Sequence, residues 1–269
     1  MAIITISRGS YSRGKEVAER VAKKLGYECI SRDILLDASE MFKIPEIKLI
    51  RAIEDSPSAL DRFHNGKERY VAYIQAALLK YLKEDNIVYH GLAGHFFVKD
   101  IAHVLKVRII ADMEDRVRLE MERENVSEEK AVKTIIKNDE QRRKWSLFLY
   151  GIDTWESSLY DLVVHIKNIN PDDAANIICN AASLDRFKTT VESQKRIEDL
   201  ALAAEVKAIL MDLSPYVETT ANNGVINVVA KTHEYGNADI EFQLKKVAGS
   251  IKGVKEVNIR VLPVTHFTD

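Results

Sequence analysis

Residues 3–16 read IITISRGSYSRGKE, a short β-branched apolar run that leads directly into a loop bounded by two glycines. Gly9 and Gly14 stand five positions apart, and Lys15 follows at once. This spacing fits the G-x-x-x-x-G-K part of the phosphate-loop pattern, in which successive backbone N–H groups form a concave anion site. Glu16 stands where a hydroxyl residue usually reaches a magnesium ion. The stretch therefore predicts a phosphate site and leaves the metal ligands unidentified.

The flanking residues predict a strand before this loop and a helix after it. Apolar residues recur at helical spacing beyond the loop until a glycine supplies a stop, and these are Val17, Val21, Ala22, Leu25 and then Gly26. The partial positive charge of the helix N-terminus would add to the anion site. The alternative is a plain strand-to-helix turn with a solvated lysine. The residues expected to hold nucleotide phosphates, called the phosphate loop below, are Gly9, Ser10, Tyr11, Ser12, Arg13, Gly14, Lys15 and Glu16.

Composition narrows the class of protein without defining it. The 269 residues suffice for one large domain or two ordinary ones, and 39 basic against 41 acidic residues give a formal charge of -2. Nothing in this balance suggests a nucleic-acid or anionic-membrane surface. Cys29 and Cys179 lack CxxC spacing, which argues against a disulfide framework and a zinc site. No signal sequence precedes the first strand and no apolar run approaches ~20 residues, so we expect a cytoplasmic protein without a transmembrane segment.

The pattern along the chain alternates strands with helices. Short apolar runs at residues 27–30, 87–89, 107–111 and 162–166 follow the first strand, and helical patterns lie between them, notably over residues 34–42 and 68–84. Such alternation predicts an α/β fold with a parallel sheet that binds ligands beyond the carboxyl ends of its strands.

A charged helical stretch lies between the fourth and fifth predicted strands, from Glu114 to about Trp155. Guanidinium groups above the sheet are suited to clamp a transferring phosphoryl group, because they match phosphate oxygens bidentately. The alternative is that they are solvated or paired at i,i+4 with residues such as Glu120 and Glu122. The arginines concerned are Arg116, Arg118, Arg123, Arg142 and Arg143.

Several runs of residues resemble the cytidylate-kinase-like proteins. They are residues 5–8, 14–17, 25–27, 33–35, 111–116, 121–129 and 160–162, of which the Met-Glu-Arg-Glu-Asn run at 121–125 is the most specific. The resemblance covers about residues 1–183. It implies a P-loop nucleoside-monophosphate kinase fold, with a parallel sheet flanked by helices and a helical lid. For active relatives it implies MgATP-dependent phosphoryl transfer to CMP or dCMP.

The resemblance also implies roles for single residues. Lys15 matches the basic residue of the phosphate loop, and Asp139 and Arg142 match the D-x-x-R spacing of the lid, where the arginine stabilises charge on the transferring group. These three are the predicted catalytic residues. The expected cofactors are ATP and Mg²⁺, the latter without identified protein ligands. The predicted substrate-binding residues are Asp33, Arg123 and Arg143.

The last third of the chain changes character after Pro215. A helix over about residues 190–213, two strands joined by the turn at 222–224, a helix over 240–251 and a strand over 257–261 are predicted. This small α+β arrangement resembles a BON domain over about residues 196–263, which implies an interaction module without catalytic machinery. The alternatives are packing on the kinase part or a dimer interface. The expected division is residues 1–183, a linker at 184–195, and 196–269.

Two hypotheses remain open from the sequence. The first is an ATP-dependent nucleoside-monophosphate kinase for CMP, dCMP or a related acceptor, with an appended regulatory domain whose partner is a second copy or another protein. The second is a nucleotide sensor that binds without efficient turnover. The second hypothesis is motivated by four departures from the family's pattern, namely Tyr11, Arg13, Glu16 and Leu92.

Overall fold

The computed structural model describes residues 2–10, 12–31, 33–44, 49, 66–91, 94–232 and 238–263. Tyr11 and Leu92, on which two of the predictions fall, lie outside the described residues. So do residues 45–48 and 50–65.

The N-terminal part is built on a five-stranded parallel sheet with the strand order β2-β3-β1-β4-β5. The central strand β1 places Ile4 opposite Val88 on one side and Leu105 on the other. All carboxyl ends therefore meet at one edge, which confirms the predicted α/β fold. The strands are β1 (Ile3–Arg8), β2 (Glu28–Ile30), β3 (Ile87–His90), β4 (Val104–Ala111) and β5 (Leu162–Ile166).

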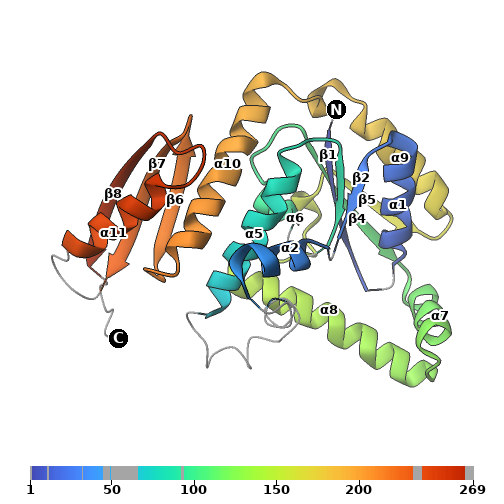
Figure 1. Cartoon of the computed structure of the whole chain (residues 1–269). Helices are drawn as coiled ribbons and strands as arrows, with labels where there is room; N and C mark the ends of the chain where they lie inside the picture. The colour runs from blue at the N-terminus through green and yellow to red at the C-terminus, as the bar shows by residue number, and fades with distance from the viewer. Residues whose placement is uncertain are drawn as a thin grey trace.

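Helices cover both faces of this sheet (Figure 1). On one face, α1 (Gly14–Leu25) and α9 (Pro171–Ala182) pack against Ile4, Ile6 and their neighbours. On the other, α2 (Asp33–Phe42), α5 (Gly66–Leu82) and the short α6 (Gly94–Phe97) enclose Ile3 and Tyr89. Because successive strand residues point to opposite faces, the β-branched run of β1 contributes to both layers.

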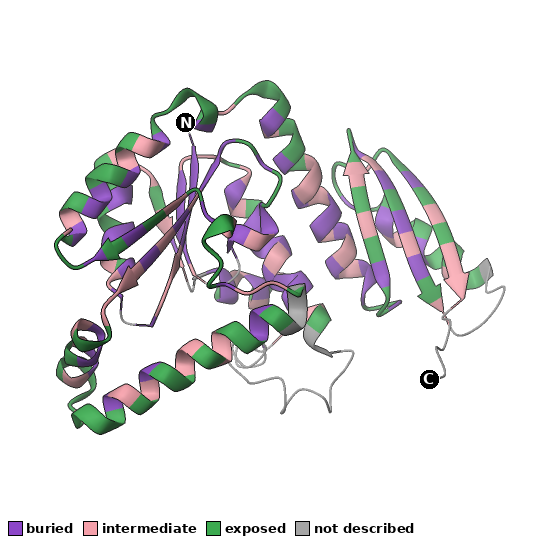
Figure 2. Ribbon diagram, turned by 180° about the vertical axis from the view of Figure 1, so that it is seen from behind, coloured by how far each residue is buried: buried purple, intermediate pink, exposed green. Residues whose placement is uncertain are grey.

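Two helices form an excursion between β4 and β5, and we call them the lid. They are α7 (Met113–Glu124) and α8 (Glu128–Tyr150), separated by Asn125 in the left-handed conformation. They pack on each other through a small cluster that includes Val117, Ala131 and Ile135. Most of α8 is exposed or half-buried (Figure 2). Near the end of α8, Trp145 is buried in the main core and anchors that end of the lid. Arg116, Asp139 and Arg142 add polar contacts between the lid and the edge of the sheet.

The C-terminal part has the predicted order of helix, two strands, helix and strand. The elements are α10 (Val191–Leu210), β6 (Val217–Asn222), β7 (Val225–Thr232), α11 (Ala238–Gly249) and β8 (Glu256–Pro263). Two 3-10 turns precede them in the chain, η2 (Ser157–Leu159) before β5 and η3 (Asp185–Phe187) between α9 and α10. Strand β7 is central, antiparallel to β6 and parallel to β8. Helix α10 stands between α5 and this small sheet, and its apolar residues belong to the same core as both (Figure 1). The division at residue 196 falls within α10 and stays a prediction.

Within the described ranges, the structure contains no helix with the length and hydropathy that crossing a bilayer requires.

Candidate functional site

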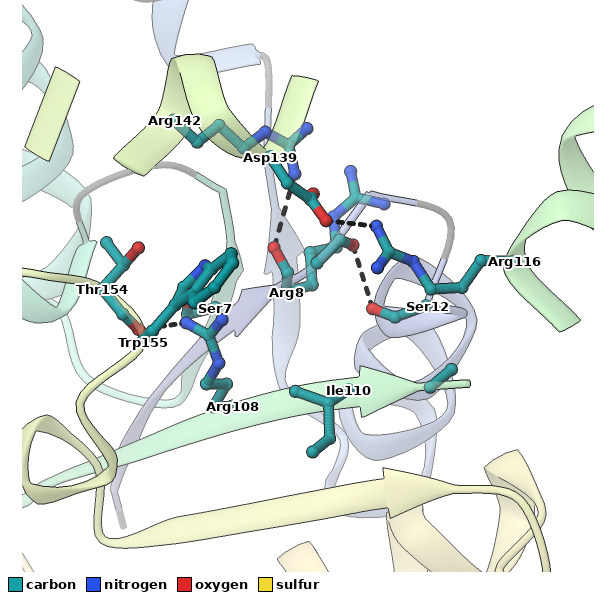
Figure 3. Close-up of a pocket in the computed structure, with 12 residues that line it drawn as sticks. Ser7, Arg8, Ser12, Arg108, Ile110, Arg116, Asp139, Arg142, Thr154 and Trp155 are labelled. Carbon is teal, nitrogen blue, oxygen red and sulfur yellow. Dashed lines mark hydrogen bonds and ion pairs between the residues drawn. The ribbon is translucent and has the colours of Figure 1, made fainter. Parts of the chain in front are cut away.

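A cavity of about 130 Å³ opens at the carboxyl ends of β1 and β4, directly against the phosphate loop (Figure 3). Four arginines line it, drawn from three separate parts of the chain, and one carboxylate, Asp139, faces them. Such a concentration of guanidinium groups fits a ligand that carries several negative charges. The arginines are Arg8 at the end of β1, Arg108 on β4, and Arg116 and Arg142 on the lid.

Asp139 and Arg116 hold the backbone of Ser10 between them. The Ser10 N–H donates to Oδ1 of Asp139 at 3.0 Å, and Nε of Arg116 donates to the Ser10 carbonyl at 2.7 Å. The two side chains also form an ion pair at 2.5 Å and are only 16 % and 11 % exposed. The Ser10 N–H of the phosphate loop therefore already donates a hydrogen bond to a carboxylate oxygen, so the backbone of this loop can bind an anionic oxygen.

The rest of the phosphate loop is fixed against β4. The Ser12 hydroxyl lies within hydrogen-bond distance of the Gly9 carbonyl, at 3.0 Å, and of the Ile109 carbonyl, at 3.1 Å. A Cβ on Gly14 would lie 2.7 Å from Cβ of Arg8, so only glycine permits this approach of α1 to β1.

Arg13 precedes α1 with φ 59°, in the left-handed region that favours glycine. Arg13, one of the departures from the family's pattern, is thus a bulky residue in a backbone conformation that favours glycine. We expect the free energy of unfolding, measured by urea denaturation, to be about 1 kcal/mol higher for Arg13→Gly than for Arg13→Ala. Both variants lose the exposed ion pair to Glu16 at 3.9 Å, so the comparison isolates the backbone. Equal stability of the two would contradict this account.

Arg142 of α8 points its guanidinium toward the end of β1, where Nη1 lies 3.4 Å from the Arg8 carbonyl (Figure 3). It enters the cavity from the side opposite to β4. The predicted pair Asp139 and Arg142 therefore converges on the phosphate loop, one residue on its backbone and the other at its entrance.

A buried polar cluster supports the floor of the cavity. Arg108 donates to the Thr154 carbonyl and to the Tyr160 hydroxyl, and that hydroxyl lies 3.3 Å from Oγ of Ser7 and 3.4 Å from Nε2 of His95. The pKa of His95 is lowered to about 3, because burial disfavours the charged ring and Arg108 and Lys106 lie nearby. A neutral His95 thus takes part in this cluster at neutral pH.

This lowered pKa makes stability depend on pH. Between about pH 6.5 and 3 the unfolded chain binds a proton that the folded chain does not, so the free energy of unfolding falls as pH drops through that window. When the pH is lowered from 7.5 to 5.5, we expect the free energy of unfolding of the wild type to fall by about 1 kcal/mol more than that of His95→Gln, as measured by urea unfolding. Parallel losses in the two proteins would show that His95 titrates normally.

Several predicted site residues lie away from the cavity. The Lys15 side chain is 64 % exposed, with its ammonium 3.6 Å from Glu19, and Glu16 pairs with Arg20 at 3.0 Å on the outer face of α1. Arg123 is 70 % exposed beside Glu124. The predicted roles of Lys15, Glu16 and Arg123 stay predictions.

Two further predicted substrate residues occupy different settings. Arg143 pairs with Asp153 and lies over the ring of Trp155, 4.9 Å from its centroid, so it borders the cavity only through that ring. Asp33 begins α2, and its side chain lies outside the description. Both assignments remain predictions.

Seven residues that line the cavity were not predicted from the sequence, and they are Ser7, Arg8, Arg108, Ile110, Ala111, Thr154 and Trp155. Arg8 carried a signal, because it stands between a strand and the first loop glycine. Arg108 did not, because one charged residue within an apolar strand is ordinary at a sheet face. Thr154 and Trp155 follow the lid, where no periodicity points to a site.

No group of three or more histidine, cysteine, aspartate or glutamate residues in the described part of the chain is arranged to hold a metal ion. Protein ligands for magnesium thus remain unidentified.

Fold and site together define an α/β protein with an arginine-bearing lid over a loop that is suited to bind phosphate. The sequence model of the cytidylate kinase-like family matches residues 3–168. The chain therefore belongs to the cytidylate kinase-like family, and its class is that of the nucleoside-monophosphate kinases. The match ends before the C-terminal part, whose likeness to a BON domain stays a prediction.

Individual relatives agree with this placement. The chain is 27% identical to the cytidylate kinase of Sulfolobus acidocaldarius over 67% of this chain and 93% of that protein. It is 30% identical to the cytidylate kinase of Sulfurisphaera tokodaii over 65% of this chain and 92% of that protein. An uncharacterized protein from Eubacterium ventriosum shares the fold with a TM-score of 0.52 at 20% identity, over 68% of this chain and 98% of its own.

Proposed function

We propose that this protein transfers the γ-phosphoryl group of ATP to CMP, dCMP or a closely related nucleoside monophosphate. The observation that carries the proposal is the convergence of Arg116, Asp139 and Arg142 of the lid on the phosphate loop at the edge of the sheet. A lid that closes arginines over a phosphate loop supplies the positioning and charge stabilisation that phosphoryl transfer requires.

The proposal assigns the following roles. Loop N–H groups and the N-terminus of α1 would bind the ATP phosphates, and Arg142 would stabilise the charge on the transferring group. An oxygen of the acceptor phosphate attacks the γ-phosphorus, the bond to the β-phosphate oxygen breaks, and ADP leaves. Lys15 can join the outer phosphates because its exposed pair with Glu19 contributes little. Magnesium would be coordinated mainly by phosphates and water.

A coupled ADP-release assay on the full chain, with a panel of nucleoside monophosphates, tests this proposal. We expect acceptor-dependent turnover that is greatest with CMP or dCMP, needs Mg²⁺ and is strongly reduced in Lys15→Ala. Folded protein that releases no ADP with any member of the panel would contradict the proposal.

A second candidate is a nucleotide sensor without efficient turnover. It is favoured by the occupation of the Ser10 N–H by Asp139 and by the outward direction of Lys15. ATP binding in calorimetry, without acceptor-dependent ADP release, would support it. Rapid Mg²⁺-dependent transfer would eliminate it.

The remaining assignments are also proposals. The C-terminal part would act as a BON-like regulatory module, through a second copy of the chain or another protein, and the protein would work in the cytoplasm.

A further inference from the structure

A second hollow, of about 420 Å³, lies where the C-terminal part meets the kinase part. It is lined by residues of α5 and α10, of the turn between β6 and β7, and of the loop between α11 and β8. It is larger than the phosphate-loop cavity and falls within the range of roughly 300–1,000 Å³ in which small-molecule sites occur. We call it the lysine groove.

Five lysines from three segments line the lysine groove. None of the five takes part in an ion pair with any residue that the structure describes. Some lysines elsewhere form ion pairs, such as Lys24 with Asp172 at 3.2 Å and Lys207 with Glu218 at 2.8 Å, and others do not, so the distinguishing feature of these five is that they line one hollow. Ammonium groups gathered in a hollow without partners raise the local positive potential and attract anions. The five are Lys80, Lys83, Lys195, Lys252 and Lys255.

The groove also offers acceptors and apolar surface. Glu198, Asp199 and Glu205 of α10 line it, and apolar contact comes from Met41 and Leu202. Carboxylates beside a phosphate site are suited to accept hydrogen bonds from ribose hydroxyls. A ligand that combines phosphates, a sugar and a flat apolar ring would use all three kinds of surface.

Two glycine turns fix the wall that carries Lys252 and Lys255. The Gly224 carbonyl accepts from the Lys255 N–H at 2.8 Å, which joins the β6–β7 turn to the loop before β8. A Cβ on Gly224 would lie 2.7 Å from the Gly253 carbonyl oxygen, and both glycines have φ in the left-handed region, 83° and 97°. This wall is therefore shaped by the fold before any ligand arrives.

We propose that the lysine groove is a second ligand site, which binds a nucleoside polyphosphate between the kinase part and the C-terminal part. Lysines from α5 and from the C-terminal loop would share the phosphate charge, and the α10 carboxylates would hold the sugar. Several lysines on different segments favour a polyphosphate over a single phosphate. The proposal does not depend on the reaction at the phosphate loop, because the two sites share no lining residue.

Isothermal titration calorimetry on the full chain tests the site with ATP, CTP and inorganic tripolyphosphate in separate runs. We expect two nucleoside triphosphates per chain. In Lys252→Gln/Lys255→Gln the second event should weaken at least about tenfold while the first persists. In Lys15→Ala the first event, at the phosphate loop, should weaken while the second event, in the groove, persists. The matched control is Lys245→Gln/Lys246→Gln, which removes the same charge from exposed positions of α11 outside the groove.

Each outcome decides the proposal. Binding that is lost in the groove variant and kept in the α11 control supports it. A single triphosphate per wild-type chain whose binding is unchanged in Lys252→Gln/Lys255→Gln, or equal weakening in the two lysine pairs, overturns the site. Tripolyphosphate that binds the groove as tightly as ATP and CTP overturns its assignment to a nucleoside ligand. Circular dichroism of each variant confirms that loss of binding is not loss of fold.

Discussion

Arg142→Ala should lower kcat for nucleoside-monophosphate phosphorylation by about 10²–10³-fold with a much smaller change in the KM for ATP. Arg142 enters the phosphate-loop cavity from α8, with its guanidinium beside the end of β1. In the proposed reaction, a charge held there would stabilise the transferring phosphoryl group more than the bound ATP. Removal of that charge would therefore affect the transition state most.

The matched control for this experiment is Lys144→Ala. Lys144 lies two positions further along α8, is exposed, and pairs only loosely with Glu140 at 4.0 Å. It should leave kcat within about twofold, because a surface ion pair contributes little. Steady-state kinetics with CMP and ATP would separate the two variants. Equal kinetics in both would mean that Arg142 does not contact the reacting phosphoryl group.

The sequence predicted the sheet well because its signals are local. Strand β5 has the predicted bounds Leu162–Ile166. Helix α1 ends at Leu25, and the left-handed conformation of Gly26 allows the N–H of Tyr27 to donate back to the Ala22 carbonyl. Helix α9 was not predicted, although Asn170 caps its first turn and Pro171 opens it. Its apolar residues contact α1, and the proline and the short run of small residues gave a weak periodic signal.

The site was predictable only in part because it depends on contacts across more than a hundred residues. Asp139 and Arg142 were found through the family resemblance, and nothing local to them indicates that they reach residues 8–10. The direction of Lys15 could not be inferred, because a lysine on the first turn of a helix can turn toward the loop or toward Glu19. Long-range convergence of charged side chains is a property of the folded chain.

Asp139→Ala should have two opposite effects on the free energy of unfolding. The variant without ligand should be less stable by about 3 kcal/mol, because the guanidinium of Arg116 is left largely buried without its carboxylate. Saturating ATP should restore more stability than it gives the wild type, because the Ser10 N–H and Arg116 become available to a phosphate without first releasing Asp139. Urea unfolding with and without ATP measures both effects.

Glu140→Ala is the control for Asp139→Ala, since the neighbouring carboxylate is 61% exposed and does not line the phosphate-loop cavity. It should unfold like the wild type and gain the same stabilisation from ATP. If the contacts of Asp139 only hold the lid in place, ATP should stabilise Asp139→Ala no more than it stabilises this control. If Asp139 competes with phosphate for the loop, the gain from ATP should be larger in Asp139→Ala alone. The second result would mean that nucleotide binding and release of the lid from the loop are a single exchange of one anion for another.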